Sequence, residues 1–178
     1  MFKKIFRVVF TVINTCLFTD KRIQSLLQRG VDDVLGNMDD FPFRVEIYFI
    51  DRFMEDDRAI IAENEPGSRE DNPIALTIFF EASTVHMVFS FDGINSLFPQ
   101  YNPLEMFEEI VGIGRHEAFH VLQYRYIFER GGMAAIAKLF AATRDVDYCD
   151  NILERGAYEF QYTGVVQDFE KDFAPYVA

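Results

Sequence analysis

The chain has 178 residues, enough for one domain with a sizeable hydrophobic core but few for two. Hydrophobic residues make up 49% of the chain, which argues against a disordered protein. The formal net charge of -12 argues against nucleic-acid binding, because that function needs a basic surface. Two cysteines, Cys16 and Cys149, are too few for a disulfide framework. We therefore expect a single domain over residues 1–178.

The N-terminal segment differs from the rest in charge. Residues 1–30 carry six basic residues and one acidic residue, whereas the remainder is strongly acidic. Apolar residues from Phe2 to Leu17 recur with helical spacing, opposite basic and polar ones. We expect an amphipathic helix that docks on the domain, with contact to a membrane surface as an alternative. Arg7 and Asn14 interrupt the apolar run, which favours a cytoplasmic protein and leaves export or anchoring open.

The next segments change from helical to extended character. A second amphipathic helix is predicted over about residues 20–36, so that residues 1–38 form an N-terminal helical segment. From Phe43 to Ile50 polar and apolar residues alternate, which predicts a half-buried strand. Three further strands are predicted, at Arg58–Glu63, Ile74–Phe80 and Thr84–Phe91.

A long helical pattern begins at Pro103. Pro103 suits the first turn of a helix and Asn102 its N-cap. We expect this helix to run to about Glu129, where the pair Gly131-Gly132 stops it.

Two shorter helices complete the predicted order. One covers about residues 133–143, and the last begins near Asp150 and continues past Val166. Helices, then a small antiparallel sheet, then helices again indicate an α+β fold.

The motif that carries chemistry lies inside the long helix, as His116-Glu117-Ala118-Phe119-His120. Two histidines four residues apart share one helix face, so their imidazoles converge on one metal ion. Glu117 points to the adjoining sector, where it reaches a metal-bound water without displacing a ligand. The competing interpretation, ordinary helix residues, would leave titratable groups beside apolar ones without partners, which is costly.

A catalytic zinc site needs a third protein ligand and keeps one position for water. We favour Glu154, because Ala157 shares its helix face and a small side chain there lets the two helices approach closely. Phe160 is expected to pack below. A site of three histidines would have to use His86, which is predicted to face solvent. The other acidic candidates downstream are Asp145, Asp147, Asp150 and Glu159.

The motif at 116–120 together with Glu154-Arg-Gly-Ala157 resembles the gluzincins, and particularly the small single-domain minigluzincins. The resemblance covers roughly residues 103–165. It implies a zincin-like fold, in which a sheet packs on an active-site helix and a C-terminal ligand helix. It also implies that His116, His120 and Glu154 bind Zn²⁺, with Glu117 as the general base of a zinc-dependent peptidase. The partner would then be a peptide or protein substrate.

Two further expectations concern the substrate. The oxyanion formed during hydrolysis needs a second donor, and Tyr158 is preferred because it lies one turn beyond Glu154. Three other tyrosines are available for this role, Tyr124, Tyr126 and Tyr162. The strand at Thr84–Phe91 is expected to be the sheet edge to which an extended peptide adds.

The competing function is a non-enzymatic binding or regulatory protein with a vestigial or structural metal site. Glu117 argues against it, because a structural site has no need of a base at that position. Structural sites also favour four protein ligands, often with Cys. Coordination by Cys149 would therefore favour this second function.

Overall fold

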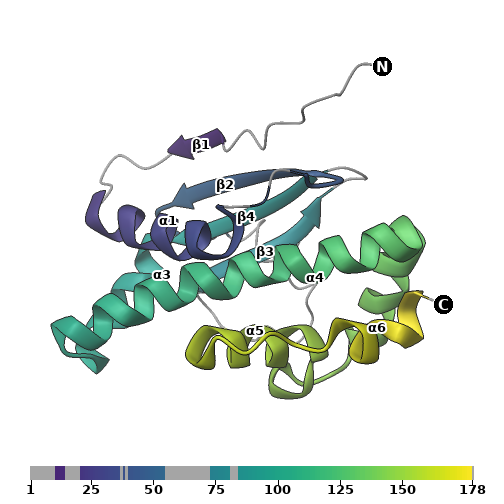
Figure 1. Ribbon diagram of the computed structural model, residues 1–178. Helices are drawn as coiled ribbons and strands as arrows, with labels where there is room; N and C mark the ends of the chain where they lie inside the picture. The colour runs from purple at the N-terminus through teal and green to yellow at the C-terminus, as the bar shows by residue number, and fades with distance from the viewer. Residues whose placement is uncertain are drawn as a thin grey trace.

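The computed structural model describes residues 11–14, 21–36, 38, 40–54, 73–80 and 84–177 (Figure 1). Several features predicted from the sequence lie outside these residues. They are most of the N-terminal helix, the strand at Arg58–Glu63 and Cys16.

The sheet contains β1 (Thr11–Asn14), β2 (Arg44–Ile50), β3 (Ala75–Phe80) and β4 (Thr84–Ser90), in the order β1-β2-β4-β3. Strand β2 runs parallel to both β1 and β4, whereas β3 and β4 are antiparallel. The sheet is therefore mixed, and the prediction of an antiparallel sheet is wrong. The β3–β4 hairpin joins the sheet through β4 rather than through β3. The strand next to β2 is therefore the one that runs in the same direction as β2.

Strand β1 also corrects the sequence prediction. A helix was expected over these residues, but Thr11–Asn14 is a strand that pairs with β2, with Thr11 opposite Glu46. The four residues are Thr, Val, Ile and Asn, and β-branched residues favour extended backbone. The edge of β2 supplies the hydrogen bonds that this backbone needs.

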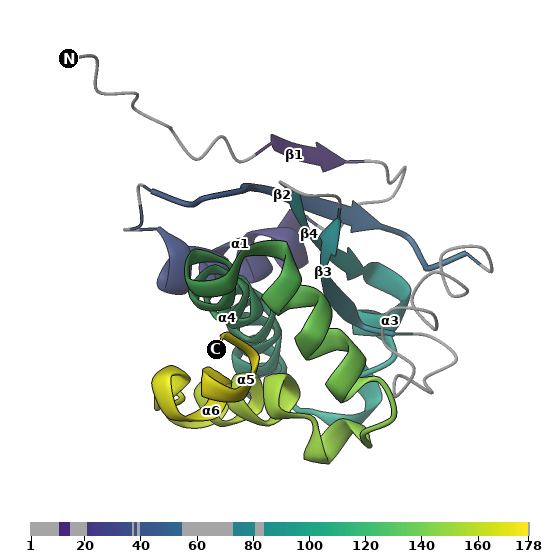
Figure 2. The same ribbon diagram turned by 90° about the vertical axis from the view of Figure 1, so that its right-hand side faces the viewer.

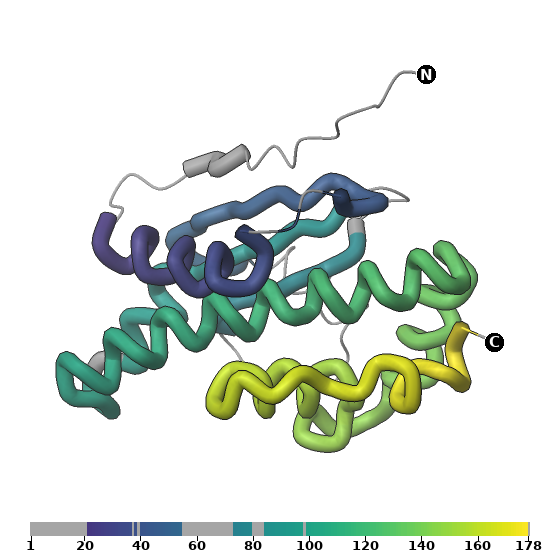
Figure 3. Tube along the Cα trace, viewed as in Figure 1, coloured from purple at the N-terminus to yellow at the C-terminus, as the bar shows by residue number. Residues whose placement is uncertain are grey.

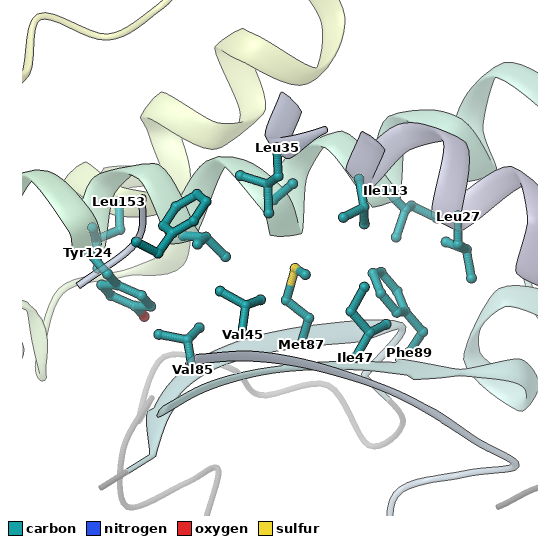
Figure 4. Packing of buried hydrophobic residues seen from close by; sticks show 14 of the residues in the cluster. Leu27, Leu35, Val45, Ile47, Val85, Met87, Phe89, Ile113, Tyr124 and Leu153 are labelled. Carbon is teal, nitrogen blue, oxygen red and sulfur yellow. The ribbon is translucent and has the colours of Figure 1, made fainter. Parts of the chain in front are cut away.

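The alternation predicted for β2 is confirmed, and β4 shows the same pattern. Both strands direct apolar side chains to the same face, where they meet apolar residues of the helices (Figure 4). The residues of this face are Val45, Ile47, Phe49, Val85, Met87 and Phe89, all buried. The hydrophobic core therefore lies between the sheet and the helix layer that carries the histidine motif.

Two helices form that layer, α1 (Lys21–Leu35) and the long α4 (Pro103–Thr143). They touch backbone to backbone at two glycines. A Cβ atom on Gly114 would lie 2.3 Å from the carbonyl oxygen of Leu27, and one on Gly30 only 2.1 Å from that of Val111. Only glycine permits this approach, which fixes α4 against α1 one turn before the motif.

The predicted start and break of the long helix are confirmed. The Asn102 side chain accepts hydrogen bonds from the first turn, and Glu105 completes a capping box. At Gly132 the backbone leaves the helical region with φ 60°, and the segment after it turns away (Figure 2). The helical segment that carries the histidines therefore ends at this glycine.

The C-terminal part packs on the opposite side of α4 from the sheet (Figure 3). Helix α5 (Ile152–Thr163) ends at Gly164, which adopts a left-handed conformation with φ 72°. The prediction of one helix past Val166 is therefore wrong, because a linker follows and then α6 (Phe169–Val177). Short helical segments complete the fold, α3 (Phe91–Asn95), η2 (Phe98–Gln100) and η3 (Tyr148–Asp150).

None of the helices in the described residues combines the length and the apolar character needed to cross a membrane.

Candidate metal centre

Helices α4 and α5 bring three potential ligands together. The Nε2 atoms of His116 and His120 are 3.2 Å apart. Oε2 of Glu154 lies 3.2 Å from the first of these nitrogens, and Oε1 lies 3.5 Å from the second. All three side chains are buried, and their ligand atoms lie within 4.8 Å of one another. This buried group can hold a metal ion.

The local sequence of α5 explains how Glu154 comes to lie beside the two histidines. Asn151 caps the helix by accepting a hydrogen bond from the backbone N–H of Leu153 at 3.0 Å. Ala157 is completely buried, as expected for a residue that allows close helix packing. The ring of Phe160 stacks on Phe119 of the motif, with centroids 4.6 Å apart. The predicted close approach of the two helices is confirmed by the burial of Ala157 and by the stacking of Phe160 on Phe119.

The charges of the three candidate ligands are strongly coupled. Burial acts to raise the pKa of Glu154, but the neighbouring His120 and His116 outweigh it and hold that pKa well below its usual range. Burial likewise acts to lower the pKa of His120, but the Glu154 carboxylate outweighs it and raises the pKa to about 10. Without a metal, the cluster therefore retains a proton that a bound cation would displace.

Glu117 lies beside the cluster and points toward β3. It is buried, and its Oε2 accepts a hydrogen bond of 2.7 Å from Oγ1 of Thr77. Burial raises the pKa of Glu117, and the charges of His116 and His120 only partly offset this. The structure thus supplies a carboxyl group beside the ligands whose affinity for a proton is increased.

Thr77 also shows which strand borders the centre. The sequence pointed to Thr84–Phe91 as the sheet edge, but β4 is enclosed between β2 and β3. Within the described part of the chain, β3 is the edge strand on this side, and its Thr77 contacts Glu117 directly. The earlier assignment is wrong because the order of strands in a sheet does not follow from their order in the sequence.

A second layer of hydrogen bonds holds one of the candidate ligands, His120. Oε1 of Gln123 lies 2.7 Å from Nδ1 of His120, and Nε2 of Gln123 donates to the carbonyl oxygen of Leu153 at 2.9 Å. Since the amide nitrogen of Gln123 faces an acceptor, its oxygen must accept the proton of Nδ1. Once a metal ion displaces the other ring proton, the lone pair of His120 is on Nε2, directed at the cluster, as metal binding requires.

Tyr148 is the functional candidate that the sequence did not reveal. The residue is 40% exposed, but partial desolvation of the hydroxyl, followed by the nearby Glu154 carboxylate and Glu117, raises its pKa. The preferred Tyr158 instead sets the edge of its ring against His116, with centroids 5.5 Å apart. In the sequence, only the position of Tyr148 in a short turn just before α5 could have indicated that this residue lies near Glu154.

The remaining tyrosine candidates have other contacts. The hydroxyl of Tyr124 donates to the carbonyl oxygen of Thr77, and that of Tyr162 donates to Glu109. Tyr126 packs on Phe169 and stacks with Arg130.

The alternative metal ligands do not join the cluster. Asp145, Asp147, Asp150 and Glu159 are exposed, and Cys149 is an exposed free thiol. His86 lies on the outer face of the sheet and is half-buried rather than solvent-facing, because it packs on Tyr48 and contacts Glu46. Among the described residues, the two motif histidines and Glu154 are the one group of this kind.

The sequence matches no model of a known protein family, and no curated protein is similar to it. The chemistry of the donor atoms is therefore the basis for a functional conclusion. Two imidazole nitrogens and one carboxylate suit zinc, and a set of three protein ligands leaves a coordination position open for water or substrate.

Proposed function

We propose that this protein is a zinc-dependent peptidase of the gluzincin type, with His116, His120 and Glu154 as the metal ligands. The observation that carries this proposal is the place of Glu117. A carboxyl group that is buried beside three ligands, yet is not one of them, serves no purpose in a purely structural site. Zinc held by the three ligands would supply a Lewis acid that activates water and polarises a peptide carbonyl.

Glu117 acts as the general base in this proposal. Its carboxylate accepts a proton from the attacking water and then delivers it to the leaving amine. The hydrogen bond from Thr77 fixes the direction of the carboxylate. Burial raises the pKa of Glu117 above the usual range of a carboxyl group, which increases its affinity for the proton of the attacking water.

Two neighbouring groups are assigned to the substrate. The Tyr148 hydroxyl, which lies beside Glu154, donates a hydrogen bond to the oxyanion as it forms. The edge of β3, next to Glu117, offers backbone groups to an extended peptide or protein segment.

The test is a comparison of Glu117→Gln with the wild-type chain. Glutamine has nearly the same shape but does not accept the proton, so cleavage of a peptide library should fall by at least about 100-fold. Zinc content, measured by elemental analysis, should stay the same. The matched control is Glu159→Gln on the exposed side of α5, which should keep full activity.

Two results would contradict the proposal. Equal cleavage by Glu117→Gln and wild type would exclude this residue as the base. A wild-type protein that binds zinc but cleaves no peptide in the library would favour the competing function, a non-enzymatic metal-binding protein.

A further inference from the structure

Two glutamine side chains form a continuous path from the C-terminal linker to the metal centre. Nε2 of Gln167, in the linker between α5 and α6, donates to the carbonyl oxygen of Ile152 at 3.1 Å. Oε1 of the same side chain accepts from Nε2 of Gln123 at 2.8 Å. Gln123 then presents its Oε1 to Nδ1 of His120 at 2.7 Å.

The hydrogen bonds in this path have only one possible direction. A backbone carbonyl only accepts, so the Ile152 oxygen fixes the Gln167 amide with its nitrogen toward α5. The Gln167 oxygen therefore faces Gln123, whose nitrogen turns toward it and whose oxygen turns toward His120. The Leu153 carbonyl oxygen accepts from the same Gln123 nitrogen and fixes this amide in the same sense, so that Gln167 and Leu153 together keep the Gln123 oxygen on Nδ1 of His120.

Helix α5 carries a glycine, which has no side chain, at the point where the two amide groups meet. A Cβ atom on Gly156 would lie 2.3 Å from Oε1 of Gln167 and 3.0 Å from Nε2 of Gln123. Gly156 is thus the residue that admits both amides, and it lies two positions after the ligand Glu154. The path and the third ligand are therefore built on the same turn of α5.

The two histidine ligands differ in the hydrogen bonding of their Nδ1 atoms. Nδ1 of His116 is buried and has no hydrogen-bond partner within the described part of the chain. Nδ1 of His120 has a partner, which is itself held by a second residue 44 positions away. The support for the ligand set is consequently concentrated on His120.

We propose that Gln167 is a positioning residue for the metal centre and acts on His120 through Gln123. This inference rests on the metal site of the proposed function, but not on peptide hydrolysis. Because Gln167 belongs to the linker that leads into α6, the C-terminal segment sets the affinity of the centre for zinc. A displacement of this linker would remove one of the two acceptors of the Gln123 amide nitrogen, leaving the Leu153 carbonyl oxygen, and would loosen the support of His120 without touching a ligand.

The first experiment measures zinc affinity of the full chain by competition with a chromophoric chelator. Gln167→Met should lower the affinity about tenfold, the lower end of the losses caused by changes in the second layer of metal sites. The matched control is Gln161→Met. Gln161 is also a half-buried glutamine that reaches α4, but among the described residues its Nε2 lies 3.5 Å from Oε1 of Glu109 rather than at a ligand. Its replacement should change the affinity by less than about twofold.

A second variant separates positioning from general stability. In Gly156→Ala the new methyl group displaces the Gln167 amide, while alanine favours the helix. We expect lower zinc affinity together with an unchanged or higher melting temperature of the metal-free chain. A loss of affinity that only followed a loss of stability would contradict the inference.

A double-mutant cycle tests the route. If Gln167 acts through Gln123, then Gln167→Met should cause little further loss in a chain that already carries Gln123→Met. Additive losses would overturn this route, and equal zinc affinities of Gln167→Met and Gln161→Met would overturn the inference as a whole. Failure of the wild-type chain to bind zinc would instead refute the proposed function, and the inference with it.

Discussion

Two clusters in this protein place a histidine, a glutamate and a tyrosine side by side, one on the outer face of the sheet and one between α4 and α5. In both, Nε2 of the histidine lies 3.2 Å from Oε2 of the glutamate. On the sheet these residues are His86, Glu46 and Tyr48, and the Tyr48 hydroxyl donates a hydrogen bond to Glu46. Burial, with the help of Glu46, raises the pKa of Tyr48 to about 12.

The two clusters differ in their fourth residue. On the sheet it is Arg44, whose guanidinium lies 2.7 Å from Oε1 of Glu46. Between the helices it is His120, whose ring can give up its proton to a bound metal ion, whereas the guanidinium of Arg44 stays charged. The carboxylate of Glu46 is paired with a guanidinium that keeps its charge, whereas the charge beside Glu154 belongs to a histidine proton that a metal ion can displace. A contact between His and Glu therefore suits a metal site only where a further potential ligand converges and the neighbouring cation can lose its charge.

Removal of a ligand should produce the largest contrast between the two clusters. His120→Ala or Glu154→Ala should lower zinc affinity by more than about 100-fold, beyond the losses typical of second-layer changes. His86→Ala and Glu46→Ala, the matched changes on the sheet, should leave zinc affinity unaltered. Elemental analysis after dialysis and chelator competition measure both. Loss of zinc in the His86→Ala protein would mean that the outer cluster contributes to metal binding.

The pH dependence of zinc binding should separate the clusters next. In the metal-free chain the pKa of His120 is raised to about 10, so zinc must displace a proton from this residue at neutral pH. Raising the pH removes that proton, and zinc affinity should therefore increase by about tenfold per pH unit below pH 10. His86→Gln should keep the same slope in chelator competition between pH 6 and pH 8. A flat profile in the wild-type chain would contradict the coupling of His120 to Glu154.

The two tyrosines should give the smallest contrast. Tyr148→Phe removes the hydroxyl beside Glu154 and should lower kcat by about 10- to 100-fold with zinc content unchanged. Tyr48→Phe removes the corresponding hydroxyl on the sheet and should leave kcat unchanged. Steady-state kinetics on a cleaved peptide measure both. An equal kcat for Tyr148→Phe and wild type would transfer the oxyanion role to another donor.

The sequence by itself determined the parts of the centre that depend on one helix. The spacing of His116 and His120 is a property of a single turn, so their convergence follows from the helical pattern alone. The same holds for Ala157, which shares the face of Glu154, and for Gly132, whose conformation breaks the long helix as predicted. Local periodicity, caps and breaks act over a few residues and are readable without a fold.

Tertiary structure decided everything that joins distant segments. The parallel pairing of β4 with β2 placed β3, not β4, at the edge next to Glu117. The contact of Tyr148 with Glu154 depends on how the turn before α5 folds back, and the pairing of Gln123 with Gln167 spans 44 positions. Such contacts arise from the packing of whole elements, and a one-dimensional pattern does not encode which elements become neighbours.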